Sequence, residues 1–238
     1  MKTKLPLVEL KSLTKIYDNK KVALKNVNLK LENNKIYGLL GKNGSGKTTL
    51  IKLINDLLTP SEGEVLIKGK KPDIASKKII AYRPERTYLD KSLTVKTAIK
   101  EYAEFYEDFS FKKAEKLLKN LELDENQKIL KMSKGMQEKL QLLLVMSRKA
   151  ELYILDEPLS GVDPATRDEI LDLIIENFEE NSSLLVSTHL ISDVERILDE
   201  VIFIKNGEIV EYSNAEKLRE QENASIDEIF RRRFKNVK

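Results

Sequence analysis

The chain has 238 residues, of which 41% are hydrophobic, so it can bury one sizeable core or a core with a smaller lobe. Its 42 basic and 39 acidic residues leave a formal net charge of +3, which gives no general reason to expect nucleic acid as a partner. It lacks cysteine, which excludes disulfides and thiolate metal sites, and it has no apolar run long enough for a signal peptide or a membrane span. We therefore expect a soluble protein that would need a partner for any role at a membrane.

Two kinds of strand are expected along the chain. Short alternating segments, typical of an antiparallel sheet, cover residues 8–13, 27–31 and 64–68. Compact apolar runs, each followed by a loop and then by helical periodicity, cover residues 36–40, 152–155 and 184–187. The compact runs indicate buried parallel strands of an α/β core.

The first compact run leads into the segment Gly-Lys-Asn-Gly-Ser-Gly-Lys-Thr-Thr at residues 41–49. This segment fits G-x-x-x-x-G-K-[ST] between a predicted strand and a predicted helix, where backbone N–H groups and the positive end of the helix can face phosphates. Lys47 is expected to reach the β- and γ-phosphates, and the Thr48 hydroxyl to ligate Mg²⁺. The residues expected to hold the phosphates of ATP are Gly41, Lys42, Asn43, Gly44, Ser45, Gly46, Lys47, Thr48 and Thr49.

Residues 84–150 form a mostly helical insert in this interpretation. Its first apolar face consists of Val95, Ile99, Tyr102 and either Phe105 or Tyr106. A second face consists of Ala114, Leu117, Leu118 and Leu121. Both faces have the spacing of amphipathic helices.

Two carboxylates, Asp156 and Glu157, directly follow the apolar run at 152–155. Ligands of open α/β sheets sit at such strand ends. Asp156 can hold Mg²⁺ through its water shell, and Glu157 can orient or polarise an attacking water. A solvated turn would explain the same residues, but the loop at 41–49 favours the functional interpretation.

The last part of the chain predicts a hairpin and a terminal helix. Residues 201–204 and 208–210 are the hairpin strands, joined by an Asn-Gly turn. Ser225 and Glu228 form a capping pattern, after which the apolar residues on one helical face are Ile226, Ile229, Phe230 and Phe234. The basic residues at 231–233 and 235 suit a solvated helix face, although a phosphate-binding or lipid-binding patch remains an alternative.

Further motifs follow one another in the order that is typical of the ATP-binding cassette (ABC) family. The sequence resembles this family over nearly its whole length. Tyr17 precedes the phosphate loop, where the family stacks an aromatic ring on adenine, although a core tyrosine would also suit this position. Residues 132–136, Met-Ser-Lys-Gly-Met, resemble the LSGGQ signature, and residues 160–163 resemble the D-loop. His189 resembles the switch histidine that contacts the γ-phosphate.

The sequence departs from the family pattern at three positions that matter for the site. Glu85 stands in place of the Q-loop glutamine, so a carboxylate that can still approach Mg²⁺ or water adds negative charge beside the phosphates. Lys134 and Met136 replace a glycine and the glutamine of the signature, while Ser133 and Gly135 are kept. The resemblance therefore still implies that the signature contacts the nucleotide held by a second cassette, but with an altered strength of that contact.

The resemblance implies an α/β fold of the P-loop NTPase type. Its RecA-like core would comprise residues of about 1–83 and 151–222, with an N-terminal antiparallel β-subdomain. An inserted α-helical subdomain would span about 84–150, and a C-terminal helix about 225–236. Together these parts would make one ABC ATP-binding domain over residues 1–238.

The same resemblance implies a Mg²⁺-dependent ATPase with Glu157, His189 and Lys47 as catalytic residues. The implied metal ligands are Thr48, Asp156 and Glu85. Ser133, Gly135 and Asp163 would bind nucleotide across a contact with a second cassette, in a homodimer or a heterodimer.

A finer likeness to ABC-2-type exporters implies a separately encoded membrane permease as partner, at the cytoplasmic face of the cell membrane. The cargo would be peptides, antibiotics or other hydrophobic compounds. Tyr82, Tyr88 and Leu89 would then line the groove for the membrane partner, or else simply pack in the core. The alternatives are a soluble cassette acting on ribosomes or DNA, and a different P-loop enzyme such as a small-molecule kinase.

Overall fold

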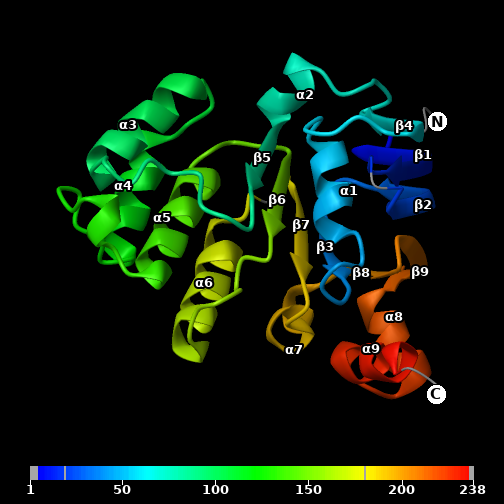
Figure 1. The fold of residues 1–238 in the computed structure, drawn as a ribbon. Helices are drawn as coiled ribbons and strands as arrows, with labels where there is room; N and C mark the ends of the chain where they lie inside the picture. Colours follow the sequence, from blue (N-terminus) through cyan, green and yellow to red (C-terminus); the bar gives the residue numbers. More distant parts are fainter. Residues whose placement is uncertain (1–4, 19, 180, 236–238) are drawn as a thin grey trace.

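The computed structural model describes residues 5–18, 20–179 and 181–235, which form two sheets with helices between and beside them (Figure 1). The smaller sheet has three strands in the order β2–β1–β4, all antiparallel. Its strands are β1 (Val8–Ile16), β2 (Val22–Leu31) and β4 (Glu62–Ile67). The alternating segments thus form the predicted antiparallel sheet, in a register that sets Leu10 between Leu29 and Val65.

The larger sheet has six strands in the order β5–β6–β7–β3–β8–β9. They are β3 (Ile36–Leu40), β5 (Ile80–Arg83), β6 (Leu152–Asp156), β7 (Ser183–Thr188), β8 (Glu200–Lys205) and β9 (Glu208–Asn214). Its neighbours pair in parallel except for β9, which returns antiparallel to β8 through the predicted Asn206–Gly207 turn. The three compact apolar runs lie side by side at the centre, as expected, whereas the four-residue β5 was not predicted.

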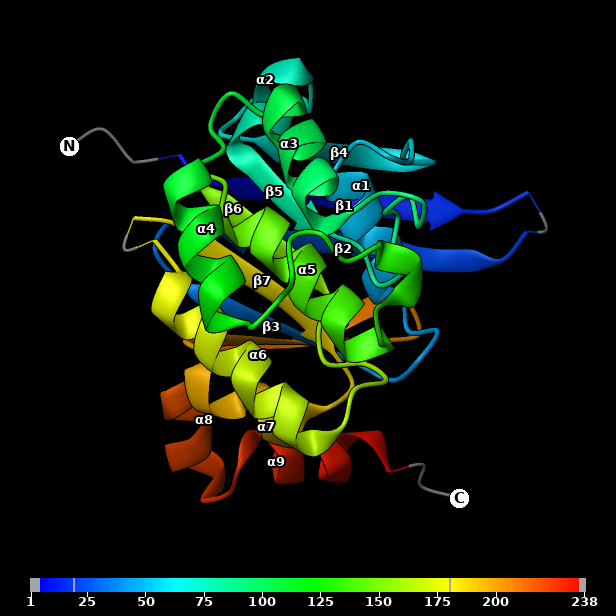
Figure 2. The ribbon, with the colours of Figure 1, turned by 90° about the vertical axis from the view of Figure 1, so that its left-hand side faces the viewer.

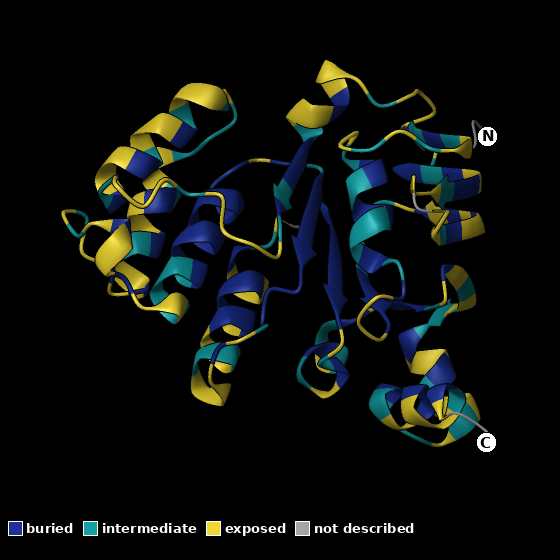
Figure 3. Cartoon of the chain, viewed as in Figure 1, coloured by how far each residue is buried: buried dark blue, intermediate teal, exposed yellow. Residues whose placement is uncertain are grey.

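Successive side chains of the central strands point into two separate cores. Ile154 belongs to the core shared with the small sheet and with helix α1 (Lys47–Ile54), whereas its neighbours Tyr153 and Leu155 belong to the core under the helices. The strands are therefore buried on both faces, as Figure 3 shows for the middle of the large sheet. This double burial explains why these runs are continuously apolar.

The segment predicted as a helical insert holds helices that stack beside one face of the large sheet (Figure 2). They are α3 (Val95–Phe105), α4 (Phe111–Asn120) and α5 (Lys134–Met146), with a short 3₁₀ turn at Ile129–Lys131. Of the two residues expected to end the first apolar face, Tyr106 packs against the core, whereas Phe105 is 83% exposed. Phe105 is the last residue of α3, and the chain turns there so that Tyr106 packs on Arg148 instead, with the guanidinium 3.9 Å from the ring centroid.

The other helices are short or lie on the second half of the chain. They are α2 (Ile74–Ile79), α6 (Pro164–Asn177), α7 (Ile191–Val194) with a 3₁₀ turn at Glu195–Ile197, α8 (Ala215–Glu222) and α9 (Ile226–Phe234). Across residues 5–18, 20–179 and 181–235, no helix combines the length and apolarity that crossing a membrane requires.

The terminal helix α9 forms as its capping pattern predicts. The side chains of Ser225 and Glu228 each accept a hydrogen bond from the other's backbone N–H. Phe230 and Phe234 stack at 3.9 Å between ring centroids and pack against Phe203 of β8. Arg231 pairs with Asp227 at 2.7 Å, as expected for a solvated helix face.

Candidate active site

Four loops meet at the carboxyl edge of the large sheet, because its strands from β5 to β8 run parallel. The phosphate loop follows β3, Asp156 ends β6, and His189 follows β7. Glu85 follows β5 by two residues. Their order follows the strand order of the sheet, and the register brings the strand ends level, with Leu40 opposite Thr188 and Asp156 opposite Ser187. This edge is where ligands of parallel sheets bind.

The phosphate loop needs glycine at two of its turns. Gly44 and Gly46 have φ angles of 79° and 115°, in the left-handed region that other residues avoid. A Cβ on Gly46 would also lie only 2.7 Å from the carbonyl oxygen of Ala23. The loop then enters α1, whose first turn has no side-chain cap, so its N–H groups and positive dipole are free to meet an anion.

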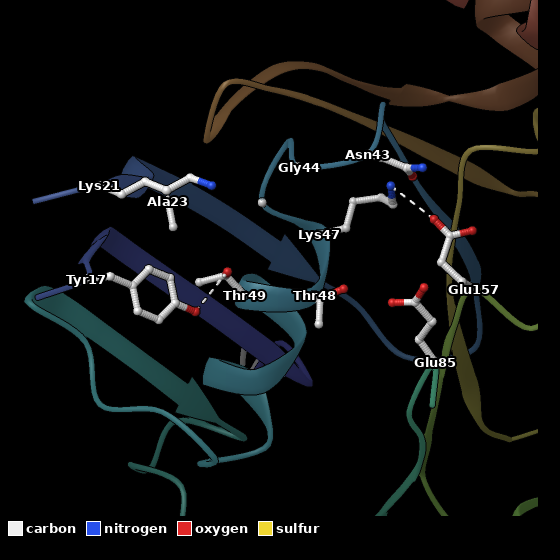
Figure 4. Close-up of a pocket in the computed structure, with 11 residues that line it drawn as sticks. Tyr17, Lys21, Ala23, Asn43, Gly44, Lys47, Thr48, Thr49, Glu85 and Glu157 are labelled. Carbon is white, nitrogen blue, oxygen red and sulfur yellow. Dashed lines mark hydrogen bonds and ion pairs between the residues drawn. The ribbon is translucent and has the colours of Figure 1, made fainter. Parts of the chain in front are cut away.

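A cavity of about 390 Å³ lies over this loop, within the size range of small-molecule sites (Figure 4). Its lining residues are Tyr17, Lys21, Ala23, Asn43, Gly44, Gly46, Lys47, Thr48, Thr49, Glu85 and Glu157. Tyr17 is 37% exposed and its hydroxyl lies 3.2 Å from the Thr49 Oγ1, so it stands at the cavity wall and not in the core. Its predicted stacking on adenine stays a prediction.

Two residues of this cavity, Lys21 and Ala23, were not predicted from the sequence. Lys21 immediately precedes β2 and Ala23 is its second residue, where the chain returns from Tyr17 towards the phosphate loop. Their only signal in the sequence is closeness to Tyr17, which does not distinguish a lining residue from an ordinary strand residue. Lys21 adds a second cation to the wall that contains Lys47.

Glu157 joins two basic side chains at the edge of the cavity. One of its oxygens lies 3.1 Å from the Lys47 Nζ and the other 2.9 Å from the His189 Nδ1. Lys47 also donates to the carbonyl of Gly41 at 2.7 Å. Lys47 and Glu157 are each 5% exposed, so their ion pair is poorly screened by solvent. Three residues predicted to be catalytic therefore form one connected group.

Asp156 is fully buried beside this group. The Ser187 hydroxyl donates to its Oδ1, whereas its Oδ2 has no hydrogen-bond partner among the described residues. Burial raises the pKa of the Asp156 carboxyl, more than the opposing Ser187 and Thr48 hydroxyls lower it. A cation at the free oxygen would stabilise the ionised form. Ser187 lies in the predicted strand before His189, but nothing in the sequence marked it as a site residue.

The side chains around Asp156 suit magnesium. Thr48 and Glu85 line the cavity, and Figure 4 shows the Glu85 carboxylate pointing towards Thr48. Within the described part of the chain, no group of three or more His, Cys, Asp or Glu side chains could hold a metal ion on its own. Magnesium typically takes only one or two protein carboxylates together with substrate phosphates, so the available oxygens fit.

Other predicted nucleotide contacts lie outside the cavity of this single chain. Ser133 caps α5 by accepting from the Met136 N–H at 3.2 Å, and Gly135 lies in the first turn of that helix. Asp163 caps α6 and accepts from the Thr166 N–H at 3.1 Å. Their roles towards nucleotide therefore stay predictions.

Lys42 belongs to the phosphate loop but points elsewhere. Its Nζ donates to the carbonyl of Phe234 in α9 at 3.1 Å. The side chain thus ties the loop to the terminal helix, and only its backbone remains available to a phosphate.

Known proteins resemble the chain over most of its length. A family model described as ABC transporter matches residues 24–160, more than half of the chain. The ABC transporter ATP-binding protein YtrB of Bacillus subtilis (strain 168) is 31% identical over 220 residues, covering 90% of this chain and 74% of YtrB. The lantibiotic transport ATP-binding protein SrtF of Streptococcus pyogenes is 30% identical over 226 residues, covering 92% of this chain and 97% of SrtF.

Solved structures agree with these relatives. The structure of the ATP-binding subunit of an ABC transporter has a TM-score of 0.82 and 28% identity, covering 94% of this chain and 98% of that one. A dimeric post-hydrolysis state of the ATP-binding cassette MJ0796, bound to ADP and Pi, has a TM-score of 0.76 and 28% identity, covering 87% and 98%. The α/β P-loop class expected from the sequence is confirmed.

Proposed function

The chain belongs to the ABC transporter family as an ATP-binding, ATP-hydrolysing cassette, and from this premise we propose that it powers the export of peptides, antibiotics or other hydrophobic compounds. The observation that best supports export is the match to SrtF, a lantibiotic transport protein, over 97% of its length. A separately encoded permease would supply the path through the membrane. The chain would then work at the cytoplasmic face of the cell membrane.

We further propose that Glu157 directs water at the γ-phosphate. Its carboxylate lies at the cavity wall, held between Lys47 and His189 at 3.1 and 2.9 Å. Lys47 would move its hydrogen bonds from the loop to the β- and γ-phosphates, which leaves Glu157 free to accept a proton from water. His189 would contact the γ-phosphate and keep Glu157 oriented.

Magnesium would be held by Thr48, Asp156 and Glu85 together with phosphate oxygens. It would neutralise charge that develops on the phosphates. Asp156 contributes a buried oxygen that has no hydrogen-bond partner in the part of the chain that the structure describes. Ser187 keeps the other oxygen of Asp156 occupied, so the carboxylate is oriented before the metal arrives.

We propose that a second cassette completes the site. The N-terminus of its α5, with Ser133 and Gly135, would face the γ-phosphate and offer N–H groups that the helix itself does not use. Asp163 would approach from the same side. The support for this pairing is the dimeric form of the related cassette MJ0796.

The permease would dock near the segment after Glu85. Of the three residues suggested for this groove, Tyr88 is 47% exposed and can meet a partner. Tyr82 and Leu89 pack against the two hydrophobic cores and suit a structural role better. Tyr88 is therefore the contact that we retain.

Export and a soluble role can be separated by isolating the tagged full-length chain from native membranes. We expect a protein with several membrane-spanning helices to co-purify, and expect the chain to release phosphate from ATP without any phosphoryl acceptor. Recovery with ribosomes or DNA, and not with a membrane protein, would contradict the transport proposal. A requirement for an acceptor would indicate a kinase.

Replacing Tyr17 with alanine should weaken ATP binding by about 5- to 160-fold, because aromatic stacking on a base contributes about 1–3 kcal/mol. The maximal hydrolysis rate should change little, since Tyr17 lies at the far wall from Glu157 (Figure 4). Titration with a fluorescent ATP analogue measures the affinity. Tyr17→Phe is the matched control, because it keeps the ring and removes only the hydroxyl near Thr49. An unchanged affinity in Tyr17→Ala would rule out stacking.

A further inference from the structure

A buried arginine links three elements behind the active site. Arg83, the last residue of β5, is 1% exposed, and its guanidinium pairs with Glu138 of α5, itself 6% exposed. The same guanidinium donates from Nη1 to the backbone carbonyl of Asp156 at 3.0 Å. Arg83 thus connects its own strand, which leads to Glu85, with the helix that begins after Ser133 and with the end of β6.

The carbonyl that Arg83 contacts belongs to the peptide between Asp156 and Glu157. The N–H of that peptide donates to the Ser187 carbonyl at 3.0 Å, so both sides of the peptide plane are fixed. Glu157 then has a φ angle of 49°, a left-handed conformation that is unfavourable for a residue with a side chain. The hydrogen bonds on this peptide hold that conformation and direct the carboxylate towards Lys47 and His189.

The stability of the folded chain does not by itself explain why Arg83 and Glu138 form a buried ion pair. Burial lowers the pKa of the Arg83 guanidinium to about 10, which reports how strongly its charge is deprived of water. An apolar pair of similar size would often be as stable as a buried ion pair. The specific gain from the pair is geometric, because a planar guanidinium can serve a carboxylate and a carbonyl at once.

We propose that Arg83 and Glu138 are positioning residues for hydrolysis, which hold the Asp156–Glu157 peptide in a fixed relation to α5. If α5 moved, Glu138 would move with it, and Arg83 would then shift the backbone of Glu157. The proposal deepens and rests on the assigned role of Glu157. Neither residue lines the nucleotide cavity, so both act without touching ATP.

The test compares Arg83→Met, Glu138→Met and the double variant in the purified full chain. We expect kcat to fall at least about tenfold in Arg83→Met, because misplacing a reacting group by about 1 Å can cost 100-fold. The ATP affinity should stay within about twofold, since the cavity wall is untouched. The double variant should regain thermal stability, because no unpaired charge remains buried, but it should not regain kcat.

Arg148→Met is the matched control for a buried arginine. Arg148 is also 1% exposed, pairs with Asp108 at 3.0 Å and donates to the Ile80 carbonyl at 2.7 Å, but it does not touch the Asp156 carbonyl. This variant should be less stable than the unmodified chain. Its kcat, calculated per folded molecule, should be unchanged. Arg83→Lys should retain more activity than Arg83→Met, because one ammonium can still donate to the Asp156 carbonyl.

Two outcomes would overturn the positioning role. One is a normal kcat in the stable double variant, and the other is an equal loss of kcat in Arg148→Met. Failure of the underlying role of Glu157 is distinguishable, because Glu157→Gln would then hydrolyse ATP normally whatever Arg83 does.

Discussion

Replacing Glu157 with glutamine should lower ATP turnover by about 100- to 10,000-fold, the contribution typical of a general base. Glutamine has nearly the same shape but no charge, so it can neither accept a proton from water nor pair with Lys47 and His189. ATP binding should persist, because the loop and Lys47 remain. The variant should therefore accumulate with bound ATP as a dimer, measurable by phosphate release and by size-exclusion chromatography with ATP.

The matched control for this variant is Glu151→Gln, immediately before β6. Glu151 pairs with Lys68 at the surface, at the opposite end of the strand from Asp156. Its replacement removes the same charge from the same segment and should leave turnover unchanged. Normal hydrolysis by Glu157→Gln would remove Glu157 from the proposed role, whether or not the dimer forms.

The sequence predicts those parts of the site that depend on the local backbone conformation and on the ends of single strands. Gly44 and Gly46 are required by left-handed backbone angles, and that requirement is visible in the sequence as a glycine pattern. Asp156 and Glu157 follow an apolar run, and parallel strands bring such ends to one edge. The pairing of β3 with β7 then places His189 near them without any further signal.

The parts that escaped prediction depend on long-range contacts. The strand β5 has four residues, too few for a clear period, and it directly precedes the helical segment. Arg83 and Glu138 are 55 positions apart in the sequence. In the sequence each is typical of a charged surface residue, and only the fold shows that both are buried. Helical periodicity alone did not distinguish the exposed Phe105 from the packed Tyr106, because it does not show where the helix ends.

The contact between two cassettes is best tested at Ser133. Replacing Ser133 with arginine should reduce ATP hydrolysis by about 100-fold, the loss typical when a donor to a developing charge is removed. The bulky side chain would occupy the space where the γ-phosphate of the partner's nucleotide must meet the start of α5. In the Glu157→Gln background, the same change should abolish the ATP-dependent dimer on size-exclusion chromatography.

Two further variants separate this contact from simple loss of a helix cap. Ser133→Ala removes the hydrogen bond to the Met136 N–H, at a cost of about 0.5–2 kcal/mol in stability, without adding bulk. Ser110→Arg makes the same serine-to-arginine change at the cap of α4, where Ser110 accepts from the Lys113 N–H at 3.3 Å, far from any expected nucleotide. Both should keep much more activity than Ser133→Arg. Unchanged hydrolysis in Ser133→Arg would mean that each chain hydrolyses ATP alone, and Ser133 and Gly135 would lose their assigned role.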